Sequence, residues 1–162
     1  MGKDIKVTEA VKFLKLNRNV VNDMLGLSVK PEQQHLISSN PEWIIDALMN
    51  DDSISYGVYF EGKPIGLISM IDPRGVDPED NFQEDCLYVW RLMVDKNSQG
   101  KGLSIKILEF IKNYAQLVGL RGISLTTMDK EAKNALNLYL NFGFFPTGRR
   151  LDKEIELLYE LL

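Results

Sequence analysis

Cysteine and histidine are nearly absent from this sequence, which contains one of each, Cys86 and His35. A single cysteine excludes a disulfide within the chain. A zinc site needs several Cys or His ligands at short spacing, so no metal cofactor is expected. No apolar run approaches the roughly 18 residues of a membrane span. The first residues, MGKDIKVTEAVKFLKLN, lack an apolar core of signal-peptide length. We therefore expect a cytoplasmic protein without a membrane partner.

A surplus of basic residues is also missing, because the formal net charge is −4. Proteins that bind nucleic acids usually carry a basic surplus that neutralises phosphates, so no nucleic-acid partner is expected. The chain has 162 residues, of which 44% are hydrophobic and 26% are charged. This length and composition are ordinary for one soluble globular domain, which we place over residues 1–162.

The order of hydrophobic patterns predicts an α/β (α+β) fold with a mixed sheet. A first strand is expected within IKVTEAVKFLKL, and YGVYF and PIGLISMI predict a hairpin around the turn pair Glu61-Gly62. Further strands are expected in CLYVWRLMV, GISLTTM, FFPTGRR and EIELLYEL. Helical spacing follows in NRNVVNDMLGLSV, after Pro31 and Pro41, after QGKG, and in KEAKNALNLYLNFG. The apolar face expected for the helix after Pro41 comprises Trp43, Ile44, Ala47 and Leu48.

The tetrapeptide QGKG joins a predicted strand to a predicted helix. The first amides of a helix have no intrahelical partner and lie at the positive end of the helix dipole, which favours phosphate. Gly100 and Gly102 keep side chains away from such a ligand, Lys101 adds positive charge, and Ser104 adds a hydroxyl. Taken alone, the pattern is equally compatible with a plain turn. It lacks the full P-loop, and Ile105 replaces the third glycine of a dinucleotide fingerprint.

Two motifs occur in order along this chain. N-S-Q-G-K-G follows the strand ending LMV, and LYLNFGF follows about forty residues later. Together they resemble the GNAT superfamily of N-acetyltransferases, whose patterns are Q/R-x-x-G-x-G/A and L-Y-x-x-x-G-F. The resemblance covers about residues 56–150. It implies a mostly antiparallel sheet of six to seven strands, splayed at its centre, with helices on both faces.

The resemblance also implies roles for particular residues, with acetyl-CoA as co-substrate. The loop would bind the coenzyme A pyrophosphate, and the preceding strand would expose backbone groups to the pantetheine arm through Leu92, Met93 and Val94. Tyr139 would be the general acid toward the leaving thiolate, because a phenol donates a proton while staying neutral near pH 7. The loop residues concerned are Gln99, Gly100, Lys101, Gly102, Leu103 and Ser104.

Two positions depart from the family pattern. Asn97 stands where Gln or Arg is usual. Ala132 stands where an asparagine often contacts the cofactor, and Asn134, two residues on, is the candidate that remains. Neither change removes the loop amides or Tyr139, so an active enzyme is still expected.

The N-terminal half resembles bacterial spermine/spermidine acetyltransferases, mainly in LSVKPEQQHLISSNPEWIIDA and GVYFEGKPIGLISM. The segment DPRGVDPEDNFQED carries six acidic residues, which would concentrate a polycation or form an ordinary solvated loop. Within it, Glu84 and Asp85 are candidates for the general base and for acceptor binding, because they adjoin the central strand. His35 and Trp90 are further candidates for acceptor binding.

The leading hypothesis is therefore direct transfer of an acetyl group from acetyl-CoA to a primary amine, with a polyamine such as spermidine or spermine as acceptor. Alternatives are another small amine, a protein amino group, or an acyl-CoA-binding module without catalysis. A nucleotide-binding protein that uses QGKG as its phosphate loop is a further alternative. A homodimer is expected only by analogy with the superfamily.

Overall fold

The structure is a computed structural model that describes residues 11–77, 80–130 and 132–161, with backbone only at positions 35, 133 and 134. Its elements are β1 (Lys12–Lys15), α2 (Arg18–Leu25), the 3₁₀ helix η1 (Pro31–Leu36), α3 (Asn40–Met49), β2 (Ser53–Phe60), β3 (Lys63–Ile71), the 3₁₀ helix η2 (Pro73–Gly75), β4 (Cys86–Val94), α4 (Leu103–Leu117), β5 (Gly122–Met128), α5 (Lys133–Phe142), β6 (Phe145–Leu151) and β7 (Glu154–Glu160). None of the helices in these ranges is long and apolar enough to cross a membrane.

Within the described ranges, seven strands form one mixed sheet in the order β1-β2-β3-β4-β5-β7-β6. All neighbouring strands are antiparallel except β4 and β5, which are parallel. The predicted hairpin is confirmed, because Glu61 and Gly62 both have positive φ, 52° and 77°, as a tight two-residue turn requires. The predicted fold class is therefore confirmed.

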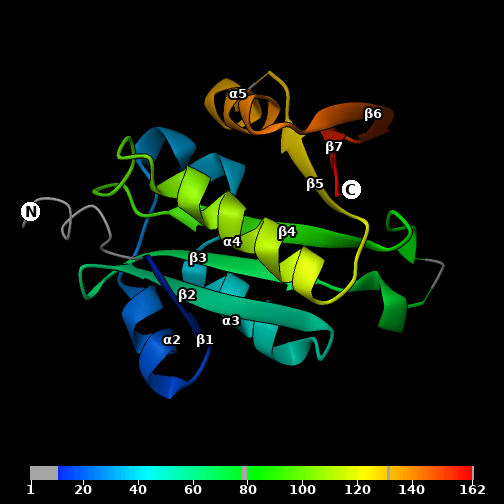
Figure 1. The fold of residues 1–162 in the computed structure, drawn as a ribbon. Coiled ribbons are helices and arrows are strands. Elements are labelled where there is room, and N and C mark those ends of the chain that lie inside the picture. Colours follow the sequence, from blue (N-terminus) through cyan, green and yellow to red (C-terminus); the bar gives the residue numbers. More distant parts are fainter. Residues whose placement is uncertain (1–10, 78–79, 131, 162) are drawn as a thin grey trace, which may run out of the picture.

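Helices cover both faces of this sheet, and each face has its own apolar core (Figure 1). The helical spacing predicted after QGKG is confirmed, and the core beneath α4 contains five of its residues: Leu103, Ile107, Leu108, Ile111 and Ala115. On the opposite face, α2 and α3 bury Met24 and Trp43 against the sheet. The prediction for Leu48 is wrong. Its side chain is 61% exposed, because α3 buries only the stripe that carries Trp43, Ile44 and Ala47.

The sheet parts between its two parallel strands. β4 and β5 are paired only from Cys86 to Val89 and from Gly122 to Leu125. Beyond these residues β4 stays with β3, whereas β5 stays with β7 and turns away (Figure 1). The result is a V-shaped opening between residues 90–94 of β4 and residues 126–128 of β5. This opening is the central splay that the family resemblance implies.

A β-bulge lies at the start of this opening. Ser69 of β3 pairs with Arg91 and Met70 pairs with Val89, so Trp90 is an extra residue on β4. An extra residue inverts the alternation of side chains between the two faces of a strand. Leu92 accordingly packs in the core beneath α4, and Arg91 turns to the opposite face, where it lies over Trp43.

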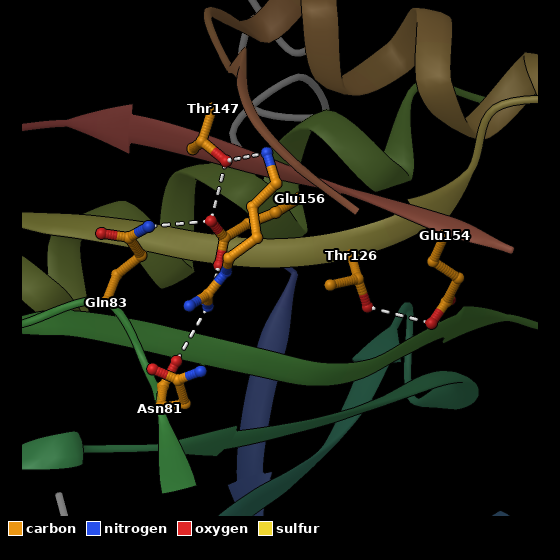
Figure 2. A network of polar contacts seen from close by, with 7 residues as sticks. Asn81, Gln83, Thr126, Thr147, Glu154 and Glu156 are labelled. Carbon is orange, nitrogen blue, oxygen red and sulfur yellow. Dashed lines mark hydrogen bonds and ion pairs between the residues drawn. The ribbon is translucent and has the colours of Figure 1, made fainter. Parts of the chain in front are cut away.

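A buried polar network holds the outer strands to the loop before β4 (Figure 2). Glu156 of β7 is 4% exposed, and its carboxylate accepts hydrogen bonds from Gln83 Nε2 (2.7 Å), Thr147 Oγ1 (2.8 Å) and Arg149 Nη2 (2.6 Å). Arg149 Nη2 also donates to the carbonyl of Asn81 at 2.8 Å. The network therefore joins residues 81–83 to β6 and β7.

Replacing Glu156→Gln should destabilise the fold, because one carboxylate oxygen becomes an amide that faces hydrogen-bond donors. We expect a loss of about 2 kcal/mol in the free energy of unfolding. This loss corresponds to a fall of roughly 4–8 °C in Tm for a chain of this size. Urea unfolding and thermal melts measure both quantities. Glu160→Gln is the matched control, since Glu160 is exposed on the same strand. Equal stability of the two variants would contradict the expectation.

Candidate active site

A cavity of about 730 Å³ occupies the opening between β4 and β5. Its walls come from residues 88–94 of β4, residues 125–128 of β5, the start of α4 and the α5 side chains Ala135, Leu138 and Tyr139. The segment around η1 closes another side through Gln33, Ile37 and Ser38. The parting of the two strands therefore creates a site that several distant segments share.

The loop at the start of α4 has the open geometry that QGKG suggests. Gly100 and Gly102 have φ of +77° and +76°, and a Cβ atom added at either would meet nothing within 4 Å. Gly102 is the N-cap of α4, and no side chain caps the first turn. The first amides of the helix are thus available to an anion. Gln99, Gly100, Gly102, Leu103 and Ser104 line the cavity, whereas Lys101 is exposed outside it.

Partly buried hydrogen bonds fix the position of this loop. The Asp95 carboxylate, 8% exposed, accepts from the backbone amides of Ser28 (2.9 Å) and Asn97 (3.2 Å). Gln99 Nε2 donates to the Val94 carbonyl at 3.0 Å and to Gln33 Oε1 at 2.9 Å. Asn97 is exposed, so its backbone, not its side chain, takes part in the loop. The motif comparison did not identify Asp95, although an Asp placed just before a turn is a known turn signal.

Three residues of β4, Leu92, Met93 and Val94, line the cavity as expected. β5 does not pair with this part of β4, so one edge of the strand is open to the cavity. Backbone groups on such an edge need partners, and a ligand with amide groups can supply them. Residues 92–94 therefore border the cavity along an open strand edge.

Tyr139 reaches the cavity from α5. Its side chain is 9% exposed and packs edge-to-face on Phe144, with ring centroids 5.7 Å apart. Burial raises the pKa of Tyr139 to about 12, so its hydroxyl is protonated at neutral pH. Gly143 ends α5 with φ +124°, where an added Cβ would lie 2.9 Å from the Tyr159 ring. The glycine of LYLNFGF thus permits the end of α5 to pack closely on Tyr159.

Arg91 lies on the opposite side of the cavity from α4. Its guanidinium is 4.0 Å from the centre of the Trp43 ring and donates to the hydroxyl (2.7 Å) and the carbonyl of Ser38. Burial lowers the pKa of Arg91 to about 10, which leaves it charged at neutral pH. Among the described residues no carboxylate forms an ion pair with it. It instead fixes the segment before α3 to β4.

Trp90 also lines the cavity and is half-buried. Its indole Nε1 donates to Ser53 Oγ at 3.1 Å, and its ring meets Trp43 edge-on at 6.3 Å. The bulge thus places an aromatic wall where the strands part. The side chains of His35 and Asn134 lie outside the described residues.

Glu84 and Asp85 lie at the other end of β4. Both are exposed, and neither lines the cavity. At a rise of about 3.3 Å per residue, Asp85 lies roughly 20 Å along the strand from Leu92. They were selected because they adjoin the central strand. They adjoin its first residues, which pair with β5, whereas the cavity opens at residues 90–94. They are therefore not brought together with Tyr139.

The sequence reasoning missed Glu154 and Thr126, which both line the cavity. Thr126 Oγ1 donates to Glu154 Oε2 at 3.2 Å across β5 and β7 (Figure 2). Residues 126 and 154 are brought together only by strand pairing, so no local motif marks them.

Comparison with known proteins identifies the fold and the family. Residues 21–144 match the family described as Acetyltransferase (GNAT) family. The chain is 32% identical over 124 residues to a probable spermine N(1)-acetyltransferase of Bacillus subtilis subsp. natto, which covers 75% of this chain and 78% of the relative. It is 27% identical over 103 residues to a streptothricin acetyltransferase of Escherichia coli, covering 64% and 53% of the two chains.

Among solved structures, spermidine N-acetyltransferase from Vibrio cholerae in complex with CoA and spermine superposes with a TM-score of 0.70. The sequences are 15% identical, and the alignment covers 94% of this chain and 95% of the other. This likeness concerns the fold. The match over residues 21–144 and the 32% identity to the probable spermine N(1)-acetyltransferase show that the chain belongs to the GNAT family and is an acetyl-CoA-dependent N-acetyltransferase.

Proposed function

We propose that this enzyme transfers an acetyl group from acetyl-CoA to a primary amine of a polyamine of the spermidine class. The observation that carries the site assignment is the cavity in the opening between β4 and β5, which receives residues from both faces of the sheet. The polyamine assignment is supported by the 32% identity to the probable spermine N(1)-acetyltransferase. The acidic loop gives weaker support, because Asp72 is already paired with Arg74 at 2.6 Å.

The residues around the opening fit coenzyme A. The amides of residues 99–104 would bind the pyrophosphate, since Gly100 and Gly102 leave space in front of an uncapped helix start. The open edge of β4 at residues 92–94 would pair with the amide groups of the pantetheine arm. The bound co-substrate supplies an acetyl group activated as a thioester.

The chain's own residues would then direct the transfer. Arg91 and Trp90 shape the side from which the amine approaches, and the uncharged nitrogen forms its bond to the acetyl carbon as the carbon–sulfur bond breaks. Tyr139 donates its hydroxyl proton to the departing sulfur and regains a proton from solvent. The proton that the nitrogen loses passes to a base or to water. Direct transfer needs both substrates in one cavity, where positioning contributes to the rate.

A second acceptor class is another small amine. The 27% identity to the streptothricin acetyltransferase supports this alternative, because that relative's name specifies an acceptor other than spermine. The two classes differ in the number and spacing of ammonium groups.

An acetyl-CoA assay with a panel of amines tests the proposal. Spermidine, spermine, lysine, an amino sugar, streptothricin and a lysine-containing peptide would be compared by release of free thiol. We expect the highest kcat/KM for spermidine or spermine, about tenfold or more above the values for lysine and the amino sugar. One extra ion pair contributes on the order of 1.4 kcal/mol, which corresponds to this factor. A higher value for streptothricin or the peptide would contradict the polyamine assignment. Tight binding of acetyl-CoA without thiol release from any acceptor would contradict catalysis.

Gly100→Ala should weaken coenzyme A binding, because its methyl group would project into the space in front of the α4 amides. We expect the Kd to rise about tenfold, which corresponds to about 1.4 kcal/mol. Gly62→Ala is the matched control. Gly62 also has φ +77° with nothing within 4 Å, so the backbone cost of about 1–2 kcal/mol should be similar. Calorimetric titration and urea unfolding separate affinity from stability. Equal coenzyme A affinity in the two variants would remove Gly100 from the phosphate site.

Tyr139→Phe should lower kcat about 100-fold, a typical effect of losing a general acid, and leave the Kd for coenzyme A within about twofold. Since burial raises the pKa of Tyr139 to about 12, the wild-type rate should show no alkaline decline from this group below about pH 10. Tyr114→Phe is the control, because Tyr114 does not line the cavity. Turnover of Tyr139→Phe at the wild-type rate would exclude the acid role.

A further inference from the structure

Glu154 differs in charge from every other described residue that lines the cavity. The lining includes the cationic residues Lys30 and Arg91, and Glu154 is its one carboxylate among the described residues. It opens β7 opposite Met128, the last residue of β5. Its side chain is half-buried, and Thr126 Oγ1 donates to its Oε2 at 3.2 Å. A single acidic group is thus fixed in the wall of an otherwise neutral or basic cavity.

The negative charge of Glu154 is not neutralised within the described part of the chain. Both arginines of the neighbouring strand β6 are taken by other carboxylates, Arg149 by Glu156 and Arg150 by Asp129. Glu156 and Glu154 are two residues apart on β7 and share one face of the sheet (Figure 2). Of these two glutamates, Glu156 has an ion pair, with Arg149, and Glu154 has none among the described residues. A partly buried carboxylate without a cationic partner is stabilised when a cationic ligand binds to it.

Strand alternation places Glu154 on the side of the sheet away from α4. Ile123 and Leu125 of β5 pack in the core beneath α4, so Thr126 and Met128 face the other way. Residues paired across antiparallel strands share a face, which puts Glu154 with Met128. Tyr139 belongs to the core on the α4 side. The carboxylate and the phenol therefore enter the cavity from opposite faces of the sheet.

Arg91 does not compete for this carboxylate. Its Nη atoms donate to Ser38 on the far wall, and its Nε is buried without a partner. Lys30 is exposed. An incoming ammonium group would therefore meet one available negative partner in the cavity, whereas a carboxylate-bearing acceptor would meet Glu154 as a repulsive charge.

We propose that Glu154, held in orientation by Thr126, binds an ammonium group of the acceptor other than the nitrogen that is acetylated, and thereby selects cationic aliphatic amines. This inference rests on the proposed amine acetyltransferase function of the same cavity. It assigns acceptor recognition to β7 and not to Glu84 and Asp85 at the remote end of β4. A mutation of Glu154 should change the affinity for the amine without changing the affinity for coenzyme A.

The test is Glu154→Gln, in which the amide oxygen can still accept from Thr126 while the charge is lost. We expect the KM for spermidine to rise about tenfold or more, with the Kd for coenzyme A and the Tm unchanged. Thr126→Val, which removes the orienting donor, should raise the KM about threefold. Glu160→Gln on the same strand is the control and should match the wild type, since Glu160 does not line the cavity.

The outcomes separate this inference from the proposed function. If the wild type acetylates spermidine and Glu154→Gln has a KM within about twofold of the wild-type value, only the role of Glu154 is overturned. A rise in KM for the double variant Glu84→Gln with Asp85→Asn, but not for Glu154→Gln, would also overturn this role and would place acceptor binding at Glu84 and Asp85. If the wild type releases no thiol with any amine, the proposed function fails first and the inference falls with it. A selective rise for Glu154→Gln supports both.

Discussion

The parting of β4 from β5 is the constraint on which the rest of the structure depends. Two parallel strands pair over residues 86–89 and 122–125 and then separate, although both continue. Separation leaves backbone groups of β4 without a strand partner at the centre of the molecule, where unpaired groups are costly. The bulge at Trp90 occurs at the same place and changes which side chains face which layer. An interior opening with an unpaired strand edge is suited to a ligand that brings its own amides.

The two faces of the opening carry different chemistry for a physical reason. On the α4 side, an uncapped helix start, two left-handed glycines and a protonated phenol suit an anionic thioester. On the other side, the inverted alternation after the bulge presents Arg91, and strand pairing presents Glu154. Because the sheet lies between these groups, the proposed anionic donor and cationic acceptor would enter from opposite faces and meet where the strands part.

Local patterns predicted much of this fold and only part of its site. CLYVWRLMV and GISLTTM coincide with β4 and β5, and the helical spacing after QGKG coincides with α4. The splay could be expected only from family resemblance, because no periodicity records where two strands stop pairing. Glu84 and Asp85 were selected for adjacency to β4, which does not reveal which end of the strand opens. Glu154 and Thr126 are 28 residues apart in sequence and come into contact only because β5 pairs with β7. No local sequence motif therefore marks their contact.

The segment between α2 and α3 connects the two halves of the site. Gln33 of η1 exchanges hydrogen bonds with Gln99 of the glycine loop, and Ser38, five residues later, is held by Arg91 of β4. Lys96 and Asp95 add backbone and carboxylate contacts to Ser28 at the start of the same segment. The glycine loop and the cavity wall that carries Arg91 are thus parts of one hydrogen-bonded unit. In the proposed direct transfer, such a unit would fix the distance between the two reacting groups, on which the rate depends.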